Sequence, residues 1–205
     1  MKDLGEAKKV LGMKIEQGWK GGKISLTQNG YLKKALQKSN INGDTKSVST
    51  PLAPHFKSKA TMSPTSVKER EYMTHVLHAS EVGSFIYWMV CTRPDLLRAV
   101  SMDNRYMHNP GRGYWEAMIW ILCYIKGTID VDLVFKKDIT RKQECIRYVD
   151  SDYARDLDKC WSTTGYVFTL SEALINWSYT LQFTIALSTM EIEYMALREA
   201  IKKTI

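Results

Sequence analysis

The chain has 205 residues, of which 44% are hydrophobic and 25% are charged. These values are typical of a globular protein and exclude wholesale disorder. No apolar run reaches the roughly 18 residues that a transmembrane helix needs. Residues 1–6 lack the basic and apolar segments of a signal peptide. We therefore expect an intracellular protein, cytoplasmic or nuclear, that is neither bound to a membrane nor secreted.

The net charge of +7 is unevenly distributed along the chain. Residues 1–50 contain ten lysines and four acidic residues, whereas residues 145–205 contain six basic and eight acidic residues. A basic N-terminal region attracts polyanions, although surface lysines are also common on faces that contact only water. We expect weak, salt-sensitive binding of nucleic acid by eight lysines: Lys8, Lys9, Lys14, Lys20, Lys23, Lys33, Lys34 and Lys38.

The four cysteines, Cys91, Cys123, Cys145 and Cys160, lie far apart in the sequence. None forms the close pair of a zinc knuckle, and four cysteines in this length do not make a disulfide scaffold. The spacing predicts four unrelated, reduced thiols.

The first third of the chain predicts a hairpin, a short helix and a connector. Residues 10–16 and 23–28 alternate apolar and polar side chains on either side of a glycine-rich turn, which predicts a β-hairpin. Residues 30–39 carry apolar side chains at helical spacing. Residues 40–66 are rich in Ser, Thr, Pro, Asn and Lys, which indicates a connector.

The middle of the chain predicts three helices. The first covers about residues 68–90, the second begins near Pro94 and runs to about residue 107, and the third covers 114–126. The many aromatic and methionine side chains here are typical of a helix-packing core. Gly127 stands where a left-handed helix cap is expected.

From residue 132 the pattern changes to strands, at 133–135, 145–149, 165–170 and 174–179. Ser188 and Glu191 then form the signature of a capping box before another amphipathic helix. Strands followed by a helix favour an antiparallel sheet with a helix on one face. The fold class predicted for the chain is therefore α+β.

Six acidic residues lie at the two ends of this C-terminal region: Asp150, Asp152, Asp156, Asp158, Glu191 and Glu193. Carboxylates that converge from a strand and a helix can hold divalent cations, which in turn can cleave a phosphodiester. Spacing alone equally allows turn-forming aspartates and a helix-capping glutamate.

Several strings in one order resemble the pol polyprotein of copia-type retrotransposons. They include "MKDLGEA" at 1–7, "ISLTQNGY" at 24–31, "CTRPDLL" at 91–97, "YVDSDYARDLDK" at 148–159 and "ALSTMEIEYMAL" at 186–197. The likeness extends nearly from end to end. It implies a polyprotein whose parent activities are RNA-directed DNA synthesis and ribonuclease H cleavage of RNA–DNA hybrids.

The resemblance also implies a division of the chain. Residues 1–40 correspond to the last hairpin and helix of the reverse-transcriptase palm, 41–67 to a connector and 68–128 to a helical thumb or connection region. Residues 129–205 correspond to an incomplete ribonuclease H-like domain, an antiparallel sheet with one helix. The family's Tyr-x-Asp-Asp polymerase motif does not occur in this sequence.

The catalytic carboxylates of the family's ribonuclease H map onto Asp150 and Glu193. Both would bind Mg²⁺, weakly or not at all, because the family's third catalytic aspartate has no counterpart in the chain. The implied partner is an RNA–DNA hybrid or another nucleic acid, and neither a membrane nor a small-molecule substrate is indicated.

The sequence departs from the family pattern at its turns. The family usually has Gly where Arg155 stands, a basic pair at residues 160–161 and a Gly pair near residues 172–173. We therefore expect a degenerate, catalytically inactive fragment. The alternatives are a non-catalytic binding protein derived from the element, such as an effector-like interaction protein, and a product without function.

Overall fold

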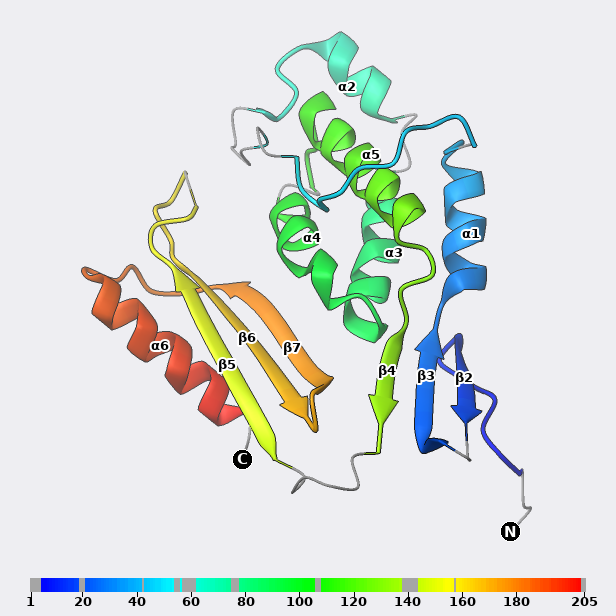
Figure 1. Ribbon diagram of the computed structural model, residues 1–205. Coiled ribbons are helices and arrows are strands. Elements are labelled where there is room, and N and C mark those ends of the chain that lie inside the picture. The colour runs from blue at the N-terminus through cyan, green and yellow to red at the C-terminus, as the bar shows by residue number, and fades with distance from the viewer. Residues whose placement is uncertain are drawn as a thin grey trace.

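The computed structural model describes residues 5–18, 21–41, 43–53, 56, 62–74, 78–105, 108–137, 144–156 and 158–203. Within these residues the fold is α+β, with two antiparallel sheets and six α-helices, as the sequence predicts. Five helices lie together, and the two sheets extend from them side by side (Figure 1). None of the helices in the described part is long and apolar enough to cross a membrane.

The N-terminal sheet confirms the predicted hairpin and extends it at both edges. Its strands follow the order β1-β2-β3-β4 with antiparallel pairing throughout. The four strands are β1 (Lys9–Val10), β2 (Met13–Gly18), β3 (Lys23–Thr27) and β4 (Leu133–Lys136). The last strand comes from far along the sequence and pairs with β3, so the helical region is inserted between two neighbouring strands.

The five grouped helices enclose the main hydrophobic core. They are α1 (Asn29–Lys38), α2 (Val67–Thr74), α3 (His78–Cys91), α4 (Leu97–Asn104) and α5 (Arg112–Gly127). Phe85 and Trp88 on α3 pack against Met118 and Leu122 on α5, all fully buried. The expectation that the aromatic and methionine side chains form a core is therefore confirmed. The helix expected at 68–90 corresponds to α2 and α3, and residues 75–77 lie outside the described part.

Gly127 does not form the left-handed cap expected from the sequence. It is the last residue of α5, and its φ is not among the positive values. A Cβ at this position would lie 3.0 Å from the Cβ of Ser47. The glycine is therefore explained by the close approach of the 40–66 connector to the end of α5, a contact that local sequence cannot reveal.

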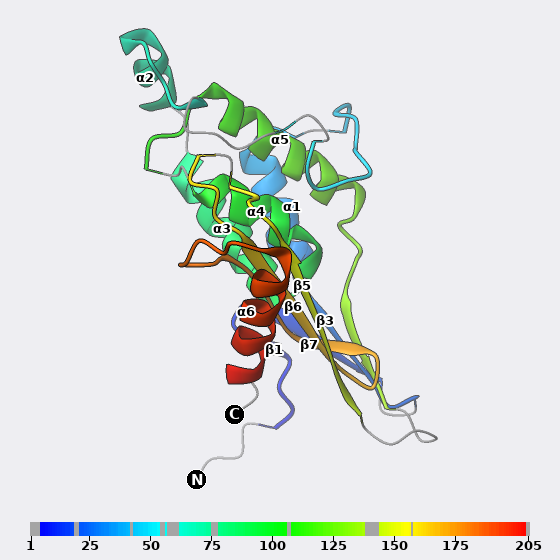
Figure 2. The same ribbon diagram turned by 90° about the vertical axis from the view of Figure 1, so that its left-hand side faces the viewer.

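The C-terminal sheet consists of β5 (Cys145–Asp152), β6 (Thr163–Leu170) and β7 (Ala173–Leu181), in that order. Helix α6 (Thr189–Lys202) covers one face (Figure 2). The predicted capping box is present: Ser188 Oγ accepts a hydrogen bond from the Glu191 N–H at 3.2 Å. The Glu191 carboxylate in turn accepts a bond from the N–H of Leu187 at 2.8 Å.

The two halves of the molecule meet where β7 lies against α3 and α4. The Trp177 indole donates a hydrogen bond to the carbonyl oxygen of Met89 at 2.8 Å, and the Ser101 hydroxyl donates to that of Tyr179 at 3.2 Å. Each bond joins a side-chain donor to a backbone carbonyl oxygen, and the two together fix the position of β7 against α3 and α4.

A buried arginine links the end of α3 to the end of α5. Arg93 is fully buried and donates to both carboxylate oxygens of Asp95, at 2.9 Å from Nε and 2.7 Å from Nη2. It also donates to the carbonyl and hydroxyl oxygens of Thr128, just beyond α5. The Tyr124 hydroxyl donates to Asp95 at 2.9 Å, and burial raises the pKa of Tyr124. A planar guanidinium supplies these donors in one fixed geometry.

Replacing Arg93 by Met should therefore lower the free energy of unfolding by about 3 kcal/mol, because it leaves the partners of a buried ion pair unsatisfied. Urea unfolding monitored by tryptophan fluorescence measures the change. The control is Arg112→Met, which removes an exposed pair with Glu116 and should cost less than about 1 kcal/mol. Equal losses in the two variants would contradict a special role for Arg93.

The β6–β7 hairpin is closed by two residues that both adopt positive φ. Ser171 has φ 49° and Glu172 has φ 67°, between the paired residues Leu170 and Ala173. Two left-handed residues are characteristic of the type I′ turn, which favours Asn and Gly. The turn therefore stores strain at the place where the resembling family usually has a glycine pair.

Replacing Ser171 by Gly should raise the free energy of unfolding by about 0.5–1 kcal/mol, because glycine adopts positive φ without a clash of Cβ. The matched control is Ser178→Gly on β7, which should instead lower stability by a similar amount. Thermal and urea unfolding of the two variants test the sign. A loss of stability in Ser171→Gly would show that the turn is not strained.

Candidate functional site

Asp150 and Glu193, the two predicted metal ligands, line one cavity. Asp150 lies near the end of β5, and Glu193 lies in the second turn of α6. The cavity has a volume of about 270 Å³, and Val149, Ser151 and Leu197 contribute to its wall. Both acidic side chains are exposed to solvent. The packing of α6 against β5 thus brings together a strand residue and a helix residue that are 43 positions apart in the sequence.

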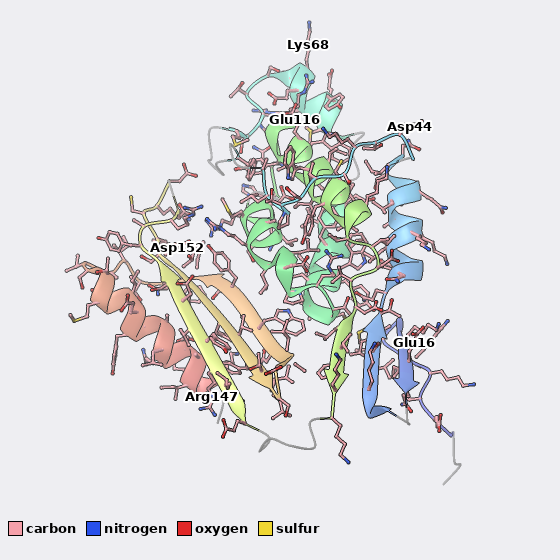
Figure 3. All side chains as sticks on the ribbon, in the orientation of Figure 1. Glu16, Asp44, Lys68, Glu116, Arg147 and Asp152 are labelled. Carbon is pink, nitrogen blue, oxygen red and sulfur yellow. The ribbon has the colours of Figure 1, made fainter. Side chains whose placement is uncertain are left out.

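Three of the other four acidic residues form ion pairs or hydrogen bonds with nearby groups. Asp152 lies 3.9 Å from the Arg155 guanidinium, and Glu191 caps α6. Asp156 is buried, pairs with Arg105 at 3.5 Å and accepts hydrogen bonds from the N–H groups of Asp158 and Lys159. The turn and cap interpretations therefore describe Asp156 and Glu191. In Figure 3, Asp152 and Arg147 lie toward opposite ends of β5.

The predicted metal ligands at this cavity are two carboxylates. No group of three or more His, Cys, Asp or Glu side chains arranged for a metal occurs among the described residues. Asp150 and Glu193 supply two carboxylates at an open cavity. Mg²⁺ keeps several of its waters and accepts one or two protein carboxylates, so this pair is chemically compatible with a hydrated ion.

The lysines predicted to bind nucleic acid do not all lie together. Lys9, Lys14 and Lys34 line a second cavity, of about 480 Å³, between the N-terminal sheet and the start of α1. We call this the basic cavity. Lys38 instead pairs with buried Glu81 at 3.6 Å, and Lys20 lies outside the described residues. The remaining members of the predicted set are exposed but do not line this cavity: Lys8, Lys23 and Lys33.

The start of α1 adds backbone and side-chain groups that sequence reasoning missed. Gln28, Asn29 and Gly30 line the basic cavity, and no acidic residue occurs in the first turn of α1. The N-terminus of a helix carries a partial positive charge that favours anions. The position of Gln28 is fixed because its Oε1 accepts a hydrogen bond from the Thr92 hydroxyl at 2.7 Å. In the sequence, the only sign of this contribution is the change from a strand pattern to a helix pattern at residues 27–29.

Like charges are paired across this sheet. Lys9 on β1 lies directly opposite Lys14 on β2, and Lys23 on β3 lies opposite Lys136 on β4. Such pairs destabilise a sheet. Lys14 is partly compensated by Glu16, at 2.7 Å, which raises the pKa of the lysine and lowers that of the glutamate (Figure 3). The remaining excess of positive charge is available to an anion.

Comparisons with known proteins find similarity over the whole length of the chain. It is 45% identical over 206 residues to the "Retrovirus-related Pol polyprotein from transposon TNT 1-94" of Nicotiana tabacum, a match that covers 100% of this chain and 15% of that protein. The chain therefore spans about 15% of the length of this curated relative.

Two shorter relatives are covered more fully. The "Secreted RxLR effector protein 161" of Plasmopara viticola is 38% identical over 133 residues, which cover 65% of this chain and 92% of the relative. The "Uncharacterized mitochondrial protein AtMg00810" of Arabidopsis thaliana is 33% identical over 197 residues, which cover 96% of this chain and 77% of the relative.

No family model and no solved structure matches the chain. The family is shown instead by the curated sequences, which include further transposon Pol polyproteins from Arabidopsis thaliana at 39% and 31% identity. The resemblance seen in the sequence is thereby confirmed. This chain belongs to the family of retrovirus-related Pol polyproteins of transposons.

Proposed function

We propose that this segment of a Pol polyprotein binds nucleic acid through its sugar-phosphate backbone at the basic cavity, and that it does not by itself cleave RNA–DNA hybrids. The observation that carries the proposal is the convergence of Lys9, Lys14 and Lys34 with the N-terminus of α1 around one cavity. The carboxylates of Asp150 on β5 and Glu193 on α6 form a separate site.

The cavity has the chemistry of a phosphate-binding surface. Three ammonium groups and the positive end of a helix dipole face the same volume, together with the carboxylate of Glu16, which pairs with Lys14, so the lining keeps an excess of positive charge. The lysines lie on a β-sheet and a helix rather than on a loop. Lysine binds phosphate as a point charge and does not read bases. Neutralisation by phosphate would also remove the repulsion between Lys9 and Lys14, so binding should be electrostatic and largely independent of sequence.

Replacing Lys9, Lys14 and Lys34 together by Gln should weaken binding of a fluorescent RNA–DNA hybrid by about tenfold or more. The slope of log K against log salt should fall by about 1 for each lysine that contacts phosphate. Fluorescence anisotropy at several salt concentrations measures both quantities. The control is Lys68→Gln, Lys202→Gln and Lys203→Gln together, which removes the same charge elsewhere. An equal loss in this control would show that net charge alone drives binding.

Asp150 and Glu193 are the residues that would hold Mg²⁺. A bound ion of this kind activates water and stabilises the leaving oxygen during phosphodiester hydrolysis. Two-metal cleavage requires further carboxylate oxygens to offset the repulsion between the ions. Asp152 and Asp156 are oriented toward arginines, so they are poorly placed to supply those oxygens. The proposal therefore assigns weak metal binding and little turnover to this segment.

With Mg²⁺ or Mn²⁺, the purified chain should leave an RNA–DNA hybrid essentially uncut, and Asp150→Asn should be indistinguishable from it. Gel analysis of a labelled hybrid measures cleavage, and an active ribonuclease H serves as the positive control. Isothermal titration with Mg²⁺ provides a second readout, in which Asp150→Asn should remove the weak binding heat. Robust turnover that Asp150→Asn abolishes would overturn the proposed inactivity and establish the site.

A second candidate function is that of a non-catalytic interaction protein. It is favoured by the relative whose printed name is a secreted RxLR effector, because the match covers 92% of that protein. The string Arg-x-Leu-Arg does not occur in this sequence. Salt-insensitive or absent nucleic-acid binding would favour this second function over the first.

We also propose an intracellular location, cytoplasmic or nuclear. All four cysteines are free thiols, and Cys145 and Cys160 are exposed. Exposed thiols persist in a reducing compartment, whereas oxidising compartments favour disulfides.

A further inference from the structure

The outer face of α6 is apolar and exposed. The inner face of the helix, with Ile192, Ala196 and Ala200, is buried against the sheet. A second apolar stripe lies on the side of the helix away from these buried residues. Its members are Met190, Tyr194, Leu197 and Ile201, which are 79%, 71%, 49% and 48% exposed. A helix with two apolar faces buries only one of them in this fold.

Apolar side chains are also exposed in the segment before the helix. Phe183 and Leu187 are 94% and 88% exposed, and Ile185 is also exposed. Single exposed apolar residues are normal, but several of them on one helix and the segment that leads into it indicate an interaction site. We call the seven residues of this surface the α6 patch.

The spacing within α6 is that of a helix-pairing seam. Met190, Tyr194, Leu197 and Ile201 follow one another at steps of four, three and four residues. These steps place them at successive d, a, d and a positions of a heptad. In this frame Glu191 and Arg198 occupy the two e positions, which flank such a seam.

We infer that the α6 patch pairs with the same patch of a second copy of this chain, with the two α6 helices antiparallel. In an antiparallel pair, e positions face e positions, so Glu191 of each copy meets Arg198 of the other. The stripe then packs Tyr194 against Leu197 of the second copy, a large side chain against a smaller one. The arrangement is self-complementary in both charge and shape, as a two-fold interface requires.

The helix dipoles favour the antiparallel over the parallel pair, because antiparallel helices align opposite ends of their dipoles. Within the described residues Arg198 makes no ion pair of its own, and its guanidinium can therefore turn to the second copy.

The pairing also affects the carboxylate cavity. Leu197 belongs both to the α6 patch and to the wall of the cavity that Asp150 and Glu193 line. A second copy on the patch therefore restricts access to that cavity. The basic cavity lies on the other sheet, so self-association leaves its lysines accessible, and the two proposals fail independently.

Sedimentation equilibrium of the full chain over roughly 1 µM to 1 mM tests the inference. We expect reversible dimers in the wild type. Glu191→Lys and Arg198→Glu should each stay monomeric, because each places two like-charged pairs in the interface. An equimolar mixture of the two variants should dimerise again, since both pairs across the interface of a mixed dimer once more join opposite charges.

Two controls separate pairing from folding. Ser188→Ala removes the other side-chain hydrogen bond at the start of α6 without changing charge and should dimerise like the wild type. Circular dichroism should show equal helix content in all variants, and nucleic-acid binding at the basic cavity should be retained. A wild type that stays monomeric throughout the range, a Glu191→Lys variant that dimerises normally, or a mixture that does not recover would each overturn the antiparallel pairing.

Discussion

The buried Arg93 guanidinium holds the arrangement of this chain together. It lies between the end of α3 and the residue that follows α5, and it binds Asp95 and Thr128 at once. A fully buried charge is tolerated only when its donors are satisfied, so the ends of these helices cannot separate without exposing or orphaning it. The direction in which the chain leaves α5 is thereby fixed. That direction delivers β4 to the edge of β3 and closes the N-terminal sheet.

Closure of that sheet determines where positive charge accumulates. Lys136 arrives opposite Lys23, and the hairpin already places Lys9 opposite Lys14. The helical region is joined to this sheet through Tyr87 on α3, whose hydroxyl donates a hydrogen bond to the carbonyl oxygen of Leu11 between β1 and β2. An anion bound at the proposed site would relieve the repulsion between these lysines.

Exposure and backbone strain, rather than like charges, characterise the C-terminal half. Its sheet buries one face under α6 and leaves the strand β5 largely exposed. Positive φ at Ala154, Cys160 and Ser171 adds strain at its turns, while the cavity of Asp150 and Glu193 stays open to solvent. This exposure agrees with the proposed lack of turnover, because precise catalysis requires rigid support. It also leaves an apolar helix face open for the proposed association.

The amino-acid sequence was sufficient to predict the elements and the family. Alternation at 10–28, helical spacing across 68–126 and the capping box at Ser188 are local signals, because each depends on contacts within a few residues. Only the packing of distant elements established that β4 pairs with β3, that Gly127 is required by Ser47, and that part of the lysine set shares a cavity. Asp150 and Glu193 could be paired in advance only through family resemblance. Contacts between distant residues depend on how whole elements pack, and periodicity fixes which face of an element is apolar but not which element will cover it.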